Sequence, residues 1–197
     1  MPTSIGVPTR RGRTLDHELA ADLRARRPGV ITDLLAEYGG AIGRVAYLVL
    51  RDQADADEVV SDTMVTAWRR ADQLRDDAAL RTWLLRIATR HALSRRRRRR
   101  PVQRLEAASS LAGYGEPSAD RVAVAEAIAA LPPRTRAAIA LHHVAGLTVS
   151  ETADALGTSQ NTVKSQLRDG MARLRTALDA PVRPRAAGKE EHDARRG

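Results

Sequence analysis

The segment from Ala145 to Leu178 constrains the fold most, because two short helical patterns flank a tight turn. The first pattern, Thr148–Leu156, opens with Thr-Val-Ser-Glu, which fits a capping box. Gly157 follows it and suits the left-handed residue that ends many helices. The second pattern, from Ser159 onward, is apolar on one side only. Together they predict a helix-turn-helix, a motif whose second helix enters the major groove of DNA.

Successive residues of the second helix are about 100° apart around its axis, so its apolar and polar residues fall on different sides. Its inward side carries Val163, Leu167, Met171, Leu174 and Leu178. On the polar side, Arg168 is suited to a bidentate contact with guanine and Asn161 to adenine. Lys164 and Arg175 flank this strip and suit phosphates, which position a helix without reading sequence. The candidate DNA-reading residues are Asn161, Thr162, Lys164, Ser165, Arg168 and Arg175. A helix pair that packs only against protein is the alternative.

The rest of the chain also follows helical spacing, and strand-like alternation is absent from the sequence. Upstream helices are predicted near Leu15–Arg26, over Val30–Leu50, from about Asp55 to Ala71 and from Ala79 to about Arg100. Downstream helices are predicted over 119–130 and 134–143. We expect an all-α protein with two small helical domains, at 29–100 and 119–179, joined by a flexible linker at 101–118. Residues 1–28 are expected to form a disordered or partly helical extension, and 180–197 a disordered tail.

Composition narrows the possible functions. The formal net charge of +9 favours a polyanionic partner, although an arginine-rich proteome would also raise it. The chain has no cysteine, which excludes disulfides, thiolate metal sites and cysteine nucleophiles. The first residues lack the apolar stretch of a signal peptide, and the longest apolar runs are too short to span a bilayer. We therefore expect a cytoplasmic protein without membrane insertion.

Enzyme chemistry has no support in the sequence. The histidines show no metal-ligand spacing; they are His17, His91, His142, His143 and His192. Neither a nucleophile–base pairing nor a phosphate-binding loop is recognisable. We expect no catalytic residue, no metal and no cofactor.

Two stretches resemble a known family. The sequence DADEVVSDTMVTAW at Asp55–Trp68, with LRTWLLRIATR at Leu80–Arg90, resembles the second conserved region of bacterial sigma factors. The match is closest to the two-domain extracytoplasmic-function (ECF) class. The sequence from Leu131 to Arg175 looks like the fourth region of the same family. The resemblance implies a transcription initiation factor that binds core RNA polymerase and directs promoter-specific initiation through −10 and −35 elements.

The resemblance also implies partners and contact residues. The Asp55–Trp68 helix would dock on the clamp coiled coil of the largest polymerase subunit, and the flap of the second largest subunit would be a further contact. The implied polymerase-binding residues are Asp55, Glu58, Val59, Asp62 and Met64, although the acids equally suit helix capping and solubility. Promoter DNA, double-stranded and melted, is the other partner, with an anti-sigma factor where one exists.

The helix from Ala79 would contact the −10 element with its polar side, through Thr82, Arg86, Thr89, Arg90 and Arg97. The run Arg95–Arg100 points in every direction around the helix axis. We interpret it as a salt-dependent electrostatic attraction for DNA, with a solvated helix end as the alternative.

In the family, the loop before this helix captures a flipped base, and here that loop is Ala71–Ala79. It has no aromatic residue, and Leu74 stands where an aromatic is common. Stacking on an unpaired base is worth ~1–3 kcal/mol, so we expect dependence on near-ideal promoters.

Departures from the family pattern concern promoter choice. They are Ser61, Thr152, Asn161, Gln166, Asp169 and Gly170. The rival function is a DNA-binding transcriptional activator with a C-terminal LuxR-type helix-turn-helix. Such proteins carry a receiver or ligand-binding domain upstream, usually with strands, whereas this chain is helical there.

Overall fold

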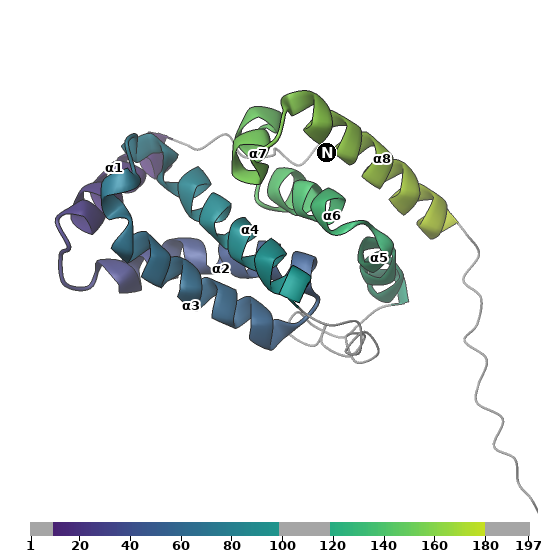
Figure 1. Ribbon diagram of the computed structural model, residues 1–197, viewed down its shortest axis with the longest axis horizontal. Coiled ribbons are helices and arrows are strands. Elements are labelled where there is room, and N and C mark those ends of the chain that lie inside the picture. Colours follow the sequence, from purple (N-terminus) through teal and green to yellow (C-terminus); the bar gives the residue numbers. More distant parts are fainter. Residues whose placement is uncertain (1–9, 99–118, 180–197) are drawn as a thin grey trace, which may run out of the picture.

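The computed structural model describes residues 10–98 and 119–179. Figure 1 shows two groups of helices, α1 to α4 and α5 to α8, lying side by side. Within the described ranges every regular element is a helix, which confirms the predicted all-α class. The predicted linker at 101–118 and tail at 180–197 lie outside the described residues.

The first unit contains α1 (Arg10–Arg24), α2 (Val30–Leu50), α3 (Gln53–Arg69) and α4 (Leu80–Arg98). Two short 3-10 turns, η1 (Ala71–Gln73) and η2 (Asp77–Ala79), connect α3 to α4. Helix α2 packs against both α3 and α4, and its apolar side is fully buried at Leu34, Ile42 and Val45. Apolar side chains at helical spacing on α2 therefore form the centre of the core of this unit.

Helix α1 is an integral part of this unit. It begins at Arg10, earlier than predicted, and buries Leu19 and Leu23 against the other helices. The hydroxyl of Tyr38 on α2 donates a hydrogen bond to the carboxylate of Asp16 on α1. Burial, together with this bond to Asp16, raises the pKa of Tyr38. A buried polar bond of this kind fixes the register between α1 and α2.

The second unit contains α5 (Ala119–Ala130), α6 (Pro133–Ile139), α7 (Val149–Leu156) and α8 (Gln160–Asp179). A single π-helical turn, η4 (Ala140–Val144), continues α6. It closes with a hydrogen bond from the Ala145 amide to the Ala140 carbonyl, 2.8 Å long. The predicted helix over 134–143 is therefore present, but its last turn is wider than an α-helix.

The helix-turn-helix has the predicted cap and turn. The Thr148 side chain accepts a hydrogen bond from the Glu151 amide, and the Glu151 carboxylate accepts one from the Thr148 amide at 2.8 Å. Gly157 ends α7 with φ 61°, a conformation that glycine adopts without steric cost. The side-chain amide of Gln160 then donates to the Ser150 hydroxyl at 3.2 Å. These contacts set the position of α8 relative to α7.

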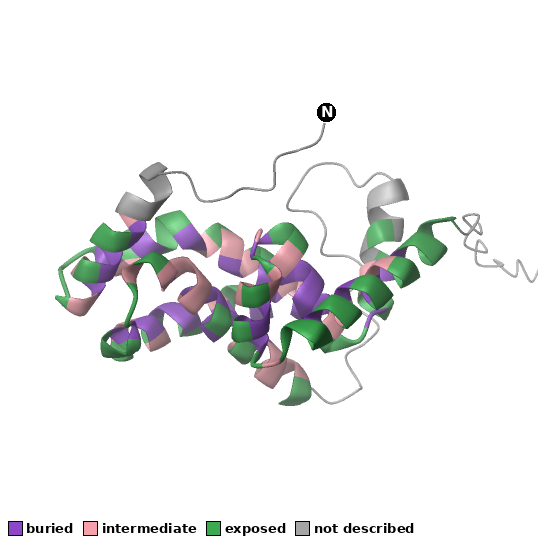
Figure 2. Ribbon diagram, turned by 90° about the horizontal axis from the view of Figure 1, so that it is seen from above, coloured by how far each residue is buried: buried purple, intermediate pink, exposed green. Residues whose placement is uncertain are grey.

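The two units contact each other through α4 and α7. The Arg81 side chain donates to the Ala145 carbonyl, and the Thr82 hydroxyl donates to the Glu151 carboxylate at 3.2 Å. Thr89 and Thr152 are fully buried. Figure 2 shows buried stretches where helices face one another and exposed ones at the end of α8. No helix in the described part of the chain is both long and apolar enough to cross a membrane.

Gly170 permits a close approach between α8 and α6. The residue is buried, and a Cβ at this position would lie 2.7 Å from Ile139 Cδ1 and 2.8 Å from Thr135 Cγ2. Gly170 is therefore a packing residue of the second unit, and this places it outside the surface that can read DNA.

We expect Gly170→Ala to lower the free energy of unfolding by about 1 kcal/mol, measured by urea denaturation. Helix propensity favours alanine by about 1 kcal/mol, but overpacking costs ~1–3 kcal/mol and outweighs it. The same change should be less destabilising in an Ile139→Val background, which removes the nearest methyl group. A Gly170→Ala protein more stable than the wild type would contradict this close packing.

We expect Thr148→Ala to destabilise the second unit by about 1 kcal/mol near neutral pH, because it removes the N-cap acceptor of α7. Burial alone would raise the pKa of Glu151, but hydrogen bonds from Thr148 and Thr82 lower it below the usual value of 4.5. The contribution of Glu151 is therefore present above pH 4.5 and disappears as the pH falls through its lowered pKa. Denaturation of both proteins over this range should show their stability difference shrinking; a constant difference would argue against the capping box.

Candidate nucleic-acid interface

Helix α8 presents the polar strip that the sequence predicts. Its inward residues Val163, Leu167 and Leu174 are buried against the second unit. All six predicted DNA-reading residues are exposed on the same helix; they are Asn161, Thr162, Lys164, Ser165, Arg168 and Arg175. An exposed polar strip over a buried apolar one is the arrangement that a groove-reading helix requires.

The charges on α8 are open to a ligand. Arg168 lies 3.3 Å from Asp169, with both side chains largely exposed, and a surface ion pair of this kind contributes only about 0–1 kcal/mol. A guanidinium held this weakly is available to a base or a phosphate. The Thr162 hydroxyl lies 2.9 Å from the Ser159 hydroxyl, so it shares a hydrogen bond at the start of the helix.

Helix α4 carries a second basic surface, with Arg86, Arg90 and Arg97 exposed. Thr82 and Thr89, which were also predicted to contact the −10 element, are not exposed. Thr89 is fully buried and donates to the Leu85 carbonyl at 2.7 Å, so its side chain faces the interior and does not reach DNA. Thr82 is partly buried and bonded to Glu151 of the second unit. Thr82 faces the second unit, which packs against α4 through α7.

Arg95 begins the arginine run but contacts protein. Its Nε donates to Asp55 Oδ1 at 2.8 Å, and its Nη2 donates to Glu58. The hydrogen bond to Asp55 and the charges of both acids raise the pKa of Arg95. Arg95 therefore joins the end of α4 to the start of α3. Its charge is used in this contact, so the interpretation of the arginine run as an attraction for DNA does not extend to Arg95.

The predicted polymerase-binding residues on α3 divide by exposure. Asp62 is exposed, and Glu58 is exposed but paired with Arg95. Asp55 keeps only 10 % of its side chain accessible, while Val59 and Met64 are buried. Val59 supports the core and is not itself accessible to a partner.

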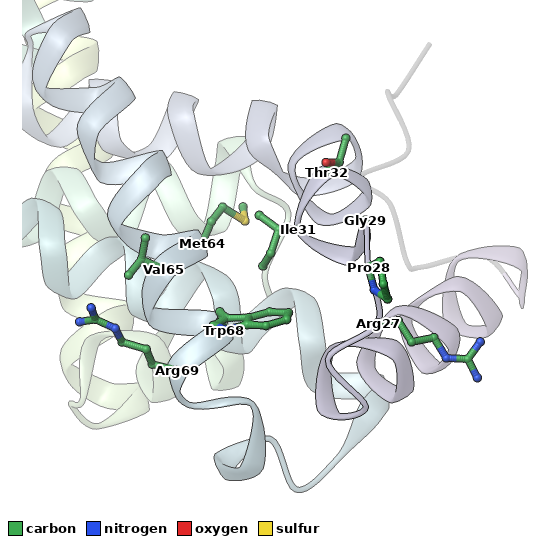
Figure 3. Close-up of a pocket in the computed structure, with 9 residues that line it drawn as sticks. All are labelled: Arg27, Pro28, Gly29, Ile31, Thr32, Met64, Val65, Trp68 and Arg69. Carbon is green, nitrogen blue, oxygen red and sulfur yellow. The ribbon is translucent and has the colours of Figure 1, made fainter.

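An apolar groove beside α3 is a feature that the sequence reasoning missed. It encloses about 490 Å³ between α3 and the turn that joins α1 to α2. Figure 3 shows Trp68, Met64 and Ile31 along this groove, with Arg27 and Arg69 at its ends. Val65, which is 49 % exposed, also lines it. The sequence signal for this groove is Val65 itself, an apolar residue of α3 that lies outside the buried apolar side of the helix.

Within 10–98 and 119–179, no three His, Asp or Glu side chains gather in a way that could hold a metal ion. The arrangement offers two exposed basic helices and an apolar groove, which suit contacts with a nucleic acid and with a protein.

Comparisons with known proteins agree with this arrangement. The family model "Sigma-70 region 2" matches residues 34–102, and "Sigma-70, region 4" matches residues 121–174. The chain is 33% identical over 165 residues to the ECF RNA polymerase sigma factor SigM of Mycobacterium tuberculosis H37Rv, covering 83% of this chain and 84% of the relative. It is 32% identical over 158 residues to the RNA polymerase sigma-E factor of Streptomyces avermitilis, covering 78% of this chain and 88% of the relative.

A solved structure gives the same result in three dimensions. The chain superposes on CnrH, in its complex with the cytosolic domain of CnrY, with a TM-score of 0.66. The two are 31% identical, and the match covers 84% of this chain and 97% of CnrH. The regions 2 and 4 matches occur in family order, on the two helical units described above. The chain therefore belongs to the ECF subfamily of sigma-70-type RNA polymerase sigma factors.

Proposed function

We propose that this sigma factor recognises its promoters by placing α8 in the major groove of the −35 element and α4 against the −10 region. The exposed strip of α8 over its buried apolar side carries this proposal. Asn161 and Arg168 are the candidate base readers, and Lys164 and Arg175 the candidate phosphate contacts. On α4, Arg86, Arg90 and Arg97 would contact the −10 DNA.

Core polymerase would dock on α3 and the groove beside it. Asp62 supplies an exposed carboxylate for a basic coiled coil, and Val65 with the edge of Trp68 supplies apolar surface. An apolar centre with a charged rim is typical of a protein–protein interface. The clamp coiled coil and the flap of polymerase are the proposed contacts. An anti-sigma factor is a further expected partner, and the similar CnrH was solved in complex with a protein segment, the cytosolic domain of CnrY.

We expect the protein to act in the cytoplasm, where it would associate with the nucleoid when active. The matches to regions 2 and 4 do not favour the alternative of a LuxR-type activator.

The function is tested by adding the purified protein to bacterial core polymerase and measuring run-off transcription on genomic promoters. We expect promoter-dependent transcripts that core polymerase alone does not produce. A protein that binds promoter fragments but neither binds core polymerase nor supports transcription would contradict the proposal.

We expect Arg168→Ala to relax base preference at one −35 position, with a loss of ~1–3 kcal/mol for the preferred sequence. Lys164→Ala should instead weaken binding to all sequences by a similar factor and reduce its salt dependence. Binding of a −35 fragment library by both variants measures the difference. Equal weakening of every sequence by Arg168→Ala would assign this arginine to the phosphates.

We expect Val65→Asp to weaken core-polymerase binding by about tenfold or more, because a carboxylate in an apolar contact loses its hydration. Val65 is 49 % exposed, so the isolated protein should fold normally. Val124→Asp is the matched control, since Val124 is 39 % exposed on α5 in the other unit. Fluorescence titration with core polymerase gives both affinities; equal affinities for the two variants would place the docking surface elsewhere.

A further inference from the structure

The loop that joins α3 to α4, residues 71–79, has an unfavourable charge for a segment beside DNA. Its sequence is Ala-Asp-Gln-Leu-Arg-Asp-Asp-Ala-Ala, with three carboxylates and one guanidinium. A carboxylate near a phosphate is repelled, and the repulsion increases where water is excluded. If this loop meets an opened DNA strand, its acids require a compensating charge.

Helix α1 supplies such a charge to one of the three acids, Asp77, through Arg24. The Nη2 atom of Arg24 lies 2.6 and 2.7 Å from the two carboxylate oxygens of Asp77. The Nη1 atom of the same guanidinium donates to the Leu74 carbonyl at 3.3 Å. The Arg24 side chain therefore contacts the Asp77 carboxylate at the start of η2 and the Leu74 carbonyl directly after η1.

This ion pair is partly shielded from water. The side chains of Arg24 and Asp77 are 35% and 20% exposed, and His17 Nδ1 of α1 lies 3.5 Å from Asp77. By contrast, Arg26 lies 4.0 Å from an Asp72 side chain that is 82% exposed. An ion pair that is partly shielded from water fixes geometry more strongly than a fully exposed surface pair does. Arg24 thus attaches the loop to α1 at both Leu74 and Asp77.

The contacts of Arg24 leave a defined part of the loop accessible. Ala71, Leu74 and Leu80 are buried, and the Asp76 carboxylate accepts a hydrogen bond from the Ala78 amide at 3.0 Å. Gln73 and Arg75 are exposed, and so are the neighbouring acids Asp72 and Asp76. The Gln73 amide and the Arg75 guanidinium can hydrogen-bond to bases or phosphates, whereas Leu74 faces the core.

We propose that Arg24 is a positioning residue for opening the −10 DNA: it neutralises Asp77 and holds the 71–79 loop so that Gln73 and Arg75 meet the opened strand. The inference rests on the proposed function, in which α4 lies against the −10 region, and it adds that the loop directly before α4 meets the opened strand. It makes α1 part of the promoter-opening machinery, although α1 itself need not touch DNA.

The test compares holoenzymes on two forms of one promoter, fully duplex and premelted across the −10 element. Permanganate reactivity of unpaired thymines measures opening of the duplex form. We expect Arg24→Ala to reduce the open fraction about tenfold at saturating holoenzyme, a loss typical of a charge-assisted contact. Binding to core polymerase and to the premelted promoter should stay close to wild type.

Two further variants separate positioning from folding. Arg44→Ala is the matched control, because Arg44 is an exposed arginine of α2 in the same unit and lines neither the groove beside α3 nor the 71–79 loop. It should open the promoter as the wild type does. The reversed pair, Arg24→Asp with Asp77→Arg, restores the attraction and should recover part of the opening. If Arg24→Ala does not fold, Asp77→Asn, which keeps the size of the side chain, replaces it.

Unchanged opening in Arg24→Ala would overturn the inference. So would equal losses on the duplex and premelted promoters without recovery by the reversed pair, because these indicate a general loss of structure. Failure of the wild-type holoenzyme to transcribe from any promoter would instead overturn the proposed function.

Discussion

Helix α4 is the element on which the rest of the structure depends, because different sides of one helix serve different partners. Its apolar side, with Leu80, Leu84 and Ala88, closes the core against α2 and α3. A neighbouring side packs against α7, while Arg86 and Arg90 remain in water. An α-helix turns by about 100° per residue, so only a few positions remain for DNA once two sides are buried. The side of this helix left between the core and α7 is therefore narrow, and Arg86 and Arg90 lie on it.

The pairing of Arg95 with Asp55 and Glu58 shows how the basic and acidic surfaces of the first unit constrain each other. Asp55 is nearly buried, and a buried carboxylate requires a partner because its desolvation is costly. Arg95 supplies that partner from the helix assigned to DNA. This arrangement ties the end of α4, the proposed DNA-binding helix, to the start of α3, the proposed polymerase-binding helix.

Local rules predicted most of the fold and part of the site. Apolar spacing located every helix from α2 to α8 within a few residues, and the capping box at Thr148 and the left-handed Gly157 follow from short-range chemistry. The polar strip of α8 was predictable because that helix buries one side only. The contact of Thr82 was not, since it depends on how the two units meet, and spacing along one helix carries no such information. The role of Gly170 likewise depends on Ile139, a residue distant in sequence.

The burial of Leu74 has a consequence for engineering this chain. Leu74 occupies the loop position where the family commonly has an aromatic residue, yet it is 3 % exposed and its carbonyl is held by Arg24. A larger ring at position 74 would enlarge the core, where added volume strains the packing, and would not create a stacking surface for a base. A designer who wants tolerance for weaker promoters would have to place the ring at Gln73 or Arg75, which are already in water.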